Sequence, residues 1–402
     1  RRTLTPGHRA SQTTYERQHM AELSDLRQRI DEIDSQIFQL FAERTEVAEE
    51  VAAYKRETGM RIFDPSRERT KVADAAERVP EDLSTYAQVL MELLMEASRA
   101  RQHELLDDAP EDATFRAISA ARRATPELFP PSARVSCQGV EGAYSQIAAE
   151  KIFRRPTISY APTFDGVFRA VEQGLARYGV IPFENSTAGS VRQVFDLMME
   201  HSFHIVRSAR VKVDHNLLAN PGARLTDIRD IYSHEQAIGQ CAEFLSGLPD
   251  VRVHVCENTA IAAERVAQSN RTDVAALSSL PCASLYGLEV LSASVQDRDN
   301  NYTRFACISK DLEIYPGADR TSLMIVLPHE PGSLYKLLAK FYALDINLLK
   351  LESRPIPERD FEFMFYFELE CPVASPEFSS LMATISGLCQ ECRYLGSYAE
   401  VL

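Results

Sequence analysis

The sequence has fewer basic than acidic residues: its 402 residues include 44 Lys and Arg against 58 Asp and Glu, and the formal net charge is −14. This charge disfavours nucleic acid or an anionic membrane surface as a partner. The sequence also lacks an apolar run of membrane-spanning length and a signal-peptide pattern. These absences favour a cytoplasmic location, and any anionic ligand must be held by local arginines.

A second pair of closely spaced cysteines is missing as well. The eight cysteines are scattered, mostly inside apolar segments, as is usual in a reducing compartment. Cys389 and Cys392 form a single C-x-x-C without a second pair or nearby histidines, so core packing is favoured over metal or redox duty. We therefore expect no metal site.

Changes of pattern divide the chain into several parts, as its length leads us to expect. Residues 1–20 are polar without a period and are interpreted as a disordered leader or a cloning remnant. The remaining pattern predicts a multidomain protein: an all-α helical domain over 21–106, a linker with a short helix over 107–133, an α/β domain over 134–312, and an α+β domain over 321–402.

The all-α domain is predicted from helical periodicity. Apolar residues recur at three- and four-residue steps from Leu23 to Val51, and no proline or glycine interrupts them before Gly59, which indicates one long amphipathic helix. Such a helix needs a packing partner. Asp64 followed by Pro65 is typical of a helix start, and a third helix is expected from Asp82 to about Leu106.

Charged residues on the first helix fall on two different faces. Arg44 and Lys55 return to within about 20° of one face, whereas Arg27 lies roughly 100° away and cannot easily serve the same pocket in the same subunit. Ser98 and Gln102 share a face of the third helix. A solvated charged face is the simpler alternative, but Arg44 and Lys55 lie next to apolar positions.

This ordered set of residues resembles the all-helical chorismate mutases over Leu23 to Leu106. In that family two protomers intertwine, and each active site takes one arginine from the partner. The resemblance implies rearrangement of chorismate to prephenate, which needs cations for two carboxylates and donors at the ether oxygen. It implies Lys55 and Gln102 as the catalytic pair at the ether oxygen, and as substrate-binding residues Arg27, Arg44, Asp64, Arg67, Glu68 and Ser98.

After Arg134, strands alternate with helices and carry polar loops at their ends, which predicts an α/β sheet that binds ligands there. The stretch from Asn300 to Phe305 gathers two amides, a phenol, a hydroxyl and a guanidinium before a buried strand. Two interpretations are open. One is a capped turn with an exposed arginine; the other is a site in which Arg304 holds a carboxylate and Thr303 offers a hydroxyl.

Five loops in this part resemble those of prephenate dehydratases, over Arg134 to about Lys310: G-x-Y-S at 142–145, PFENS at 182–186, YSH at 232–234, AALSS at 275–279 and TRF at 303–305. The resemblance implies two lobes of the periplasmic-binding-protein type with the active site between them. It implies Thr303 as donor to the departing hydroxyl and Arg304 as carboxylate anchor. The implied substrate-binding residues are Tyr144, Ser145, Glu184, Asn185, Ser186, Thr187 and Phe305.

His234 in the third loop titrates near neutrality and is tempting as a proton donor. A loop histidine that caps the next helix is an equally good interpretation. His234 is therefore not placed among the catalytic residues.

From Thr321 the order strand–helix–strand–strand–helix–strand resembles an ACT regulatory domain. Its two effector motifs match Gly332, Ser333 and Leu334 at a helix start and Glu352, Ser353, Arg354 and Pro355 after the next strand. Ser333 and Tyr335 replace the family's usual Ala and Val. The resemblance implies L-phenylalanine as effector; a dimerisation module that binds no ligand is the alternative.

Three resemblances from one pathway, in sequence order, predict a bifunctional enzyme of phenylalanine biosynthesis. It would convert chorismate to prephenate and prephenate to phenylpyruvate, without metal or organic cofactor, as a homodimer or higher homo-oligomer inhibited by L-phenylalanine. Arogenate as the second substrate is one alternative. A catalytically inactive amino-acid sensor is another, against which the intact Thr303–Arg304 pair argues.

Overall fold

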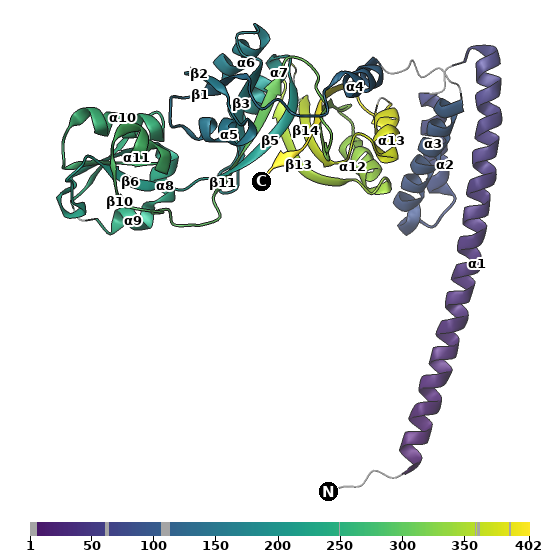
Figure 1. Cartoon of the computed structure of the whole chain (residues 1–402). Helices are drawn as coiled ribbons and strands as arrows, with labels where there is room; N and C mark the ends of the chain where they lie inside the picture. The colour runs from purple at the N-terminus through teal and green to yellow at the C-terminus, as the bar shows by residue number, and fades with distance from the viewer. Residues whose placement is uncertain are drawn as a thin grey trace. The chain divides into compact units, whose positions relative to one another are not determined.

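The computed structural model describes residues 6–60, 64–105, 113–248, 250–357, 359, 362–385 and 387–402. The chain forms two compact units, Arg1–Asp112 and Ala113–Leu402, and each is described by itself (Figure 1). Within the described residues, no helix combines the length and the apolar character needed to cross a membrane.

The first unit is helical, as predicted (Figure 1). Its elements are α1 (Pro6–Thr58), α2 (Pro65–Glu77), the 3-10 turn η1 (Glu81–Leu83) and α3 (Ser84–Leu105). Residues 6–20, expected to be a disordered leader or a cloning remnant, belong to α1; residues 1–5 lie outside the described part. Proline suits the first helical position, and neither proline nor glycine follows Gly7 until Gly59.

Local signals set the turn between the first two helices. Gly59 has a φ of 66°, the left-handed conformation in which helices commonly end. The carboxylate of Asp64 accepts the backbone N–H groups of Ser66 and Arg67 at 3.1 Å, which confirms the predicted start of α2. Helix α3 then packs against both α1 and α2.

Much of the apolar stripe on α1 is uncovered in the single chain. Ile30, Ile33 and Ile37 are each more than half exposed, at 56%, 53% and 53%, and Leu90 and Leu93 of α3 are similarly exposed. A continuous apolar face of this kind marks an interaction surface. A helix as long as α1 also gains most of its stability from packing.

The second unit contains two mixed sheets, each covered by helices, which we call the first and second lobes. The first lobe has strand order β16-β5-β11-β3-β1-β2, with β4 on β3. Its elements are β1 (Arg134–Gln138), α5 (Tyr144–Ile152), β2 (Thr157–Ala161), α6 (Phe164–Glu172), β3 (Tyr178–Asn185), β4 (Gly189–Ser190), α7 (Arg192–Glu200), β5 (His204–Lys212), β11 (Tyr302–Ser309) and β16 (Glu400–Val401).

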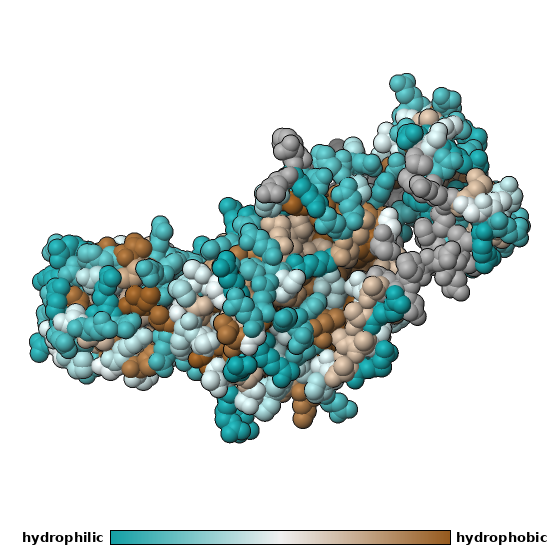
Figure 2. Space-filling model, turned by 90° about the horizontal axis from the view of Figure 1, so that it is seen from above, coloured by the Kyte–Doolittle hydropathy of each residue, from teal (hydrophilic) through white to brown (hydrophobic). Residues whose placement is uncertain are grey.

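The second lobe is inserted between β5 and β11 and has strand order β10-β6-β9-β7-β8. Figure 2 shows apolar patches on its otherwise mainly hydrophilic surface. Its elements are β6 (Asn216–Ala219), η2 (Leu225–Asp227), β7 (Asp230–Ser233), α8 (Glu235–Gln240), α9 (Ala242–Ser246), β8 (Arg252–Val255), α10 (Thr259–Ser269), β9 (Val274–Ser278), α11 (Leu280–Tyr286) and β10 (Glu289–Ser292).

Residues 320–398, here called the C-terminal domain, form a four-stranded antiparallel sheet in the order β13-β14-β12-β15. The predicted βαββαβ order is confirmed, and it is that of the split βαβ motif. Its elements are β12 (Arg320–Val326), α12 (Ser333–Ala343), β13 (Asn347–Pro355), β14 (Phe363–Glu370), α13 (Pro376–Ile385) and β15 (Glu391–Tyr398).

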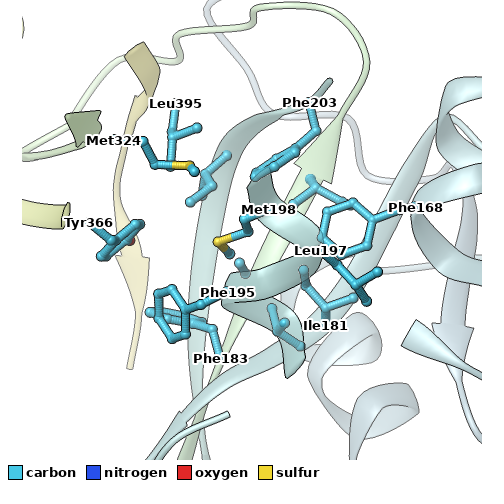
Figure 3. Close-up of a cluster of buried hydrophobic side chains, with 14 of the residues drawn as sticks. Phe168, Ile181, Phe183, Phe195, Leu197, Met198, Phe203, Met324, Tyr366 and Leu395 are labelled. Carbon is cyan, nitrogen blue, oxygen red and sulfur yellow. The ribbon is translucent and has the colours of Figure 1, made fainter. Parts of the chain in front are cut away.

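The C-terminal domain shares a hydrophobic core with the first lobe. Figure 3 shows Phe195 and Met198 of α7 facing Met324, Tyr366 and Leu395 of the C-terminal sheet, and all five are buried in one cluster. Just beyond β15, β16 pairs in parallel with β5 at the edge of the first lobe's sheet. The two sheets are therefore joined by both packing and strand pairing.

The segment expected to be a linker is packed where the structure describes it. Helix α4 (Ala113–Ala124) buries Ile118 and Ala121 against the C-terminal domain. Phe129 packs against Phe153, with ring centroids 5.1 Å apart and the ring planes tilted by 40°, and Arg207 lies over the Phe129 ring. The short helix predicted within this linker is therefore confirmed as α4, while the packing of 113–133 depends on apolar partners far along the chain that prolines and local pattern do not indicate.

Candidate active sites

Helices α1 and α3 bring four predicted residues together in the first unit. Lys55 Nζ lies 3.2 Å from Gln102 Oε1, and Gln102 is only 6% exposed. Arg44 Nη1 donates to the Leu94 carbonyl at 2.6 Å and also to Ser98 Oγ. A buried amide, an ammonium and a guanidinium thus lie along one interhelical seam.

The first turn of α2 adds charge to this seam. Burial lowers the pKa of Lys55, Asp64 and Glu68 act to raise it, and Arg67 lowers it again. Burial also lowers the pKa of Arg44. The three predicted α2 residues therefore contribute to the field at the Lys55 ammonium, although Asp64 caps α2 and Glu68 pairs with Arg99.

Arg27 does not belong to this seam within one chain. It is exposed on α1, seventeen residues before Arg44, which places it about 25 Å away along the helix axis. The angular argument from the sequence also separated Arg27 from Arg44, by placing the two residues on different faces of the helix. A pocket that uses Arg27 together with Lys55 must therefore draw on two chains.

The second unit places two predicted motifs side by side in the first lobe. Strand β11 lies between β3 and β5, and its register sets Thr303 opposite Asn185 and Arg304 opposite Glu184. Residues opposite each other on neighbouring strands share a face of the sheet. The PFENS and TRF motifs are thus brought together by strand pairing.

Backbone amides fix the orientation of the Asn185 side chain. Its Oδ1 accepts the N–H groups of Thr187 at 3.0 Å and Ala188 at 2.9 Å. Its Nδ2 therefore points the other way and donates to Asn301 Oδ1 at 2.8 Å and to Thr303 Oγ1 at 3.0 Å. Because Thr303 Oγ1 accepts this bond, its own proton is available to another acceptor.

The loop before β11 is held by Ser186. Its hydroxyl donates to the Asn300 carbonyl at 2.8 Å and accepts the Tyr302 N–H at 2.9 Å. Thr187 Oγ1 donates to Asn185 Oδ1 at 2.7 Å. These two residues therefore order the surroundings of Thr303.

Arg304 is engaged by protein carboxylates. Its Nε donates to Glu400 at 2.7 Å, its Nη1 to Glu184 and Glu368 at 2.9 Å, and its Nη2 to Glu368. The side chain is 12% exposed; burial acts to lower its pKa, but Glu368 above all, with Glu400, raises it. The expected clamp on a ligand carboxylate is thus already occupied by the protein.

Glu184 is held as a carboxylate. Burial alone would raise its pKa, but hydrogen bonds from Lys350 and Arg304 outweigh that effect and lower it. Lys350 Nζ lies 2.8 Å from Glu184 Oε1. Glu184 is therefore poorly suited to donate a proton near neutral pH.

Other predicted residues are engaged by the fold. Tyr144 Oη donates to the Asp214 carbonyl at 2.6 Å, and burial raises its pKa. Ser145 Oγ donates to the Gln138 carbonyl at 2.6 Å, and Phe305 lies in the core at 2% exposure. His234 Nδ1 accepts the Gln236 N–H at 3.2 Å at the start of α8, so the capping interpretation is confirmed.

Two residues that sequence reasoning did not place in the site join it. Asn301, 2% exposed, donates from Nδ2 to Gln240 Oε1 at 2.8 Å. Gln240, at the end of α8 in the second lobe, donates to Thr187 Oγ1 at 3.2 Å. Asn301 was visible in the polar stretch before β11, but Gln240 lies 61 residues away and had no local signal.

A pocket of about 420 Å³ lies in the C-terminal domain, and Ser333, Leu334, Phe363 and Phe365 line part of it. Gly332, with a φ of 85°, forms the N-cap of α12 beside it. Strand pairing sets Ser353 opposite Phe365 and Pro355 opposite Phe363. One face of β13 therefore belongs to the same side of the sheet as the pocket.

The other face of β13 contacts the first lobe. Lys350 pairs with Glu184, Glu352 accepts a hydrogen bond from Ser190 Oγ, and Arg354 pairs with Asp196 of α7 at 2.7 Å. The predicted motif Glu352–Pro355 is thus divided between the pocket side and the lobe side. Within the described residues, no group of His, Cys, Asp or Glu side chains could hold a metal ion.

Two family models match the chain. The model described as chorismate mutase type II matches residues 26–103, and the model described as prephenate dehydratase matches residues 135–313. The matched segments contain the α1–α3 seam and the Thr303 site, respectively.

Known proteins extend this likeness over most of the chain. The bifunctional chorismate mutase/prephenate dehydratase of Escherichia coli K12 is 30% identical, and the match covers 93% of this chain and 95% of that protein. Arogenate dehydratase/prephenate dehydratase 2 of Arabidopsis thaliana is 38% identical over 66% of this chain and 72% of its own length.

A solved structure agrees with these relatives. Prephenate dehydratase from Arthrobacter aurescens, in complex with L-Phe, is 26% identical with a TM-score of 0.60, covering 66% of this chain and 90% of its own. Both predicted parts thus have counterparts, in the same order, in one relative of nearly the same extent. The chain belongs to the family of bifunctional chorismate mutase/prephenate dehydratases.

Proposed function

We propose that the α1–α3 seam converts chorismate to prephenate, that Thr303 drives conversion of prephenate to phenylpyruvate, and that phenylalanine inhibits the second step through the C-terminal domain. The observation that carries the proposal is the Thr303 hydroxyl, which accepts an amide proton and keeps its own proton free. For the first reaction, the supporting observation is the contact between Lys55 and Gln102.

The first reaction breaks an ether C–O bond while a C–C bond forms, so it needs no nucleophile. Lys55 and Gln102 supply N–H donors to the ether oxygen as negative charge develops there. Arg44, held by Leu94 and Ser98, binds a substrate carboxylate and favours the compact reactive conformer. Burial lowers the pKa of Lys55, which makes its ammonium a better hydrogen-bond donor.

The second reaction expels a hydroxyl and carbon dioxide from one ring. The carboxylate C–C bond breaks, its electron pair enters the ring as the ring becomes aromatic, and the C–O bond breaks at the opposite end. Thr303 donates its proton to the departing hydroxyl, which leaves as water. Asn185 then stabilises the charge on Oγ1 through its N–H, until solvent returns a proton.

Arg304 is a positioning residue in this scheme. Its bonds to Glu184, Glu368 and Glu400 hold β11 in the sheet next to Thr303. A buried guanidinium with three carboxylate partners is costly to leave unpaired. The carboxylates of prephenate are therefore bound by residues other than Arg304.

Two chains complete each mutase site. The exposed stripe of Ile30, Ile33 and Ile37 supports an intertwined dimer, because pairing of two α1 helices buries it. Arg27, about 25 Å from Arg44 along α1, then reaches the partner's site. The same pairing supplies the packing that a long isolated helix lacks.

Phenylalanine binds the pocket beside Gly332, where the N-terminus of α12 suits its carboxylate and Phe363 and Phe365 suit its ring. Strand β13 connects this pocket to Glu184 and α7 through Lys350 and Arg354. The related Arthrobacter prephenate dehydratase, solved in complex with L-Phe, supports this choice of effector.

Prephenate is the preferred second substrate, because the mutase in the same chain produces it. Arogenate remains the second candidate, favoured by the Arabidopsis relative named for both substrates. A catalytically inactive sensor is disfavoured by the intact contacts of Lys55 and of Thr303.

Incubation of the protein with chorismate alone should yield prephenate first and phenylpyruvate after a lag. Chromatography of timed samples measures both products. L-phenylalanine should lower phenylpyruvate formation and let prephenate accumulate, since its pocket is coupled to the dehydratase lobe. Prephenate and arogenate supplied separately measure the preference between them. Accumulation of prephenate without any phenylpyruvate would contradict the proposal.

Mixed dimers test the shared mutase site. Arg27→Ala and Lys55→Ala proteins should each be inactive on chorismate, because each lacks one cation of every site. After subunit exchange, a heterodimer contains one site with neither lesion, so mutase activity should return to about a quarter of wild type in a statistical mixture. No recovery in mixed dimers verified by native mass spectrometry would count against the intertwined arrangement.

A further inference from the structure

His215 occupies a buried position between β5 and β6 that the reaction scheme does not use. The residue is 2% exposed. Its Nε2 lies 2.9 Å from Gln240 Oε1, and its Nδ1 is buried without a hydrogen-bond partner. Such an orphaned nitrogen is uncommon in folded proteins and asks for an explanation.

The direction of every bond between His215 and Thr303 follows from the backbone. The N–H groups of Thr187 and Ala188 fix Oδ1 of Asn185, so Asn185 Nδ2 must donate to Asn301 Oδ1. Asn301 must then turn its Nδ2 to Gln240 Oε1.

Because Gln240 Oε1 can only accept, the nitrogen that faces it from His215 must be an N–H donor. His215 is therefore the Nε2–H tautomer, and Nδ1 is left as a lone pair. Burial agrees with a neutral ring, because it lowers the pKa of His215 while Gln240 and Asp214 act to raise it. A protonated ring would bury an Nδ1–H group without an acceptor.

We infer that His215 is a positioning residue for the dehydratase step: its Nε2–H anchors the far end of the chain Gln240–Asn301–Asn185, whose near end is oriented by backbone amides, and so keeps the Asn185 amide at hydrogen-bond distance from Thr303. The inference rests on the proposed role of Thr303. The relay joins both lobes, since Gln240 belongs to α8 of the second lobe and Thr303 to β11 of the first. His215 itself touches no reacting atom.

Two substitutions separate positioning from simple packing. His215→Gln supplies an amide N–H near the Nε2 position, whereas His215→Phe keeps the ring, and with it the edge contact to Tyr144 at 6.2 Å, but removes the donor. We expect His215→Phe to lower kcat for prephenate about tenfold, less than the roughly 10²–10³ typical of a donor that touches the reacting charge. KM should change little, and His215→Gln should retain most of kcat.

An unchanged KM for prephenate reports that the unit containing His215 is folded, whereas mutase activity, which belongs to the separate helical unit, serves only to normalise the amount of protein. His204→Leu is a matched control, since His204 also has a buried, unpartnered Nδ1 but lies at the other end of β5. It should lose stability without a change of kcat. If His215→Phe does not fold, His215→Asn, whose amide is too short to reach Gln240, should show the same loss of kcat.

The inference is overturned if His215→Phe and His215→Asn turn over prephenate normally, or if His215→Gln loses as much kcat as His215→Phe. Thr303→Val separates this failure from failure of the proposed function. An active Thr303→Val protein overturns the role of Thr303 itself. An inactive one beside a fully active His215→Phe overturns only the role of His215.

Discussion

Conversion of Lys55 to alanine should lower the rate of chorismate rearrangement by about 10²–10³, the range typical for loss of one preorganised donor at a developing negative charge. The Lys55 ammonium is 3.2 Å from the buried Gln102 carbonyl oxygen, so the two donors act at one place. Prephenate supplied directly should still be dehydrated at the wild-type rate. Stopped assays on both substrates measure the two effects in one preparation.

Arg56→Ala is the matched control, because Arg56 is the next residue on α1 and is exposed. Arg44→Ala should resemble Lys55→Ala, with an added rise in KM, since Arg44 binds a substrate carboxylate. Near-normal mutase activity in Lys55→Ala would show that the α1–α3 seam is not the site.

The second large effect is expected at Thr303. Thr303→Val keeps the shape of the side chain but deletes its hydroxyl, so phenylpyruvate formation should fall by at least about 10²-fold while prephenate still binds. Thr303→Ser restores the hydroxyl and should recover much of the rate. Single-turnover measurements with prephenate, together with equilibrium binding, distinguish the chemical step from binding.

Normal turnover by Thr303→Val would move the proton donor elsewhere. The structure makes the two other candidates, His234 and Glu184, weak proton donors. His234 has Nδ1 engaged in capping α8, and Glu184 is held as a carboxylate by Lys350 and Arg304.

The parts of the fold that sequence could predict are those fixed by local signals. Asp64 and Pro65 start α2 because the cap and the first helical position are chosen within a few residues. The six elements of the C-terminal domain follow from periodicity in the same way. The PFENS and TRF motifs could be recognised from sequence, and pairing of their strands places them side by side in the structure.

Arg304 shows where local reasoning ends. Its type and neighbours indicate a carboxylate clamp, but the carboxylates that fill it, Glu368 and Glu400, lie 64 and 96 residues further along the chain. No local pattern distinguishes a clamp meant for a ligand from one filled by the protein. Gln240 and the tautomer of His215 likewise depend on contacts made only in the folded chain.

The strand β16 has a consequence for the order in which the protein forms during synthesis. Glu400 and Val401 add the edge strand next to β5, and Glu400 also neutralises Arg304. The helical unit, Arg1–Asp112, precedes the dehydratase unit in the chain, and its internal contacts need no residue beyond it. The sheet of the first lobe, in contrast, is complete only after β16 has been synthesised, and its long-range pairings form slowly. Nascent chains should therefore acquire mutase structure well before they acquire a protease-resistant dehydratase lobe.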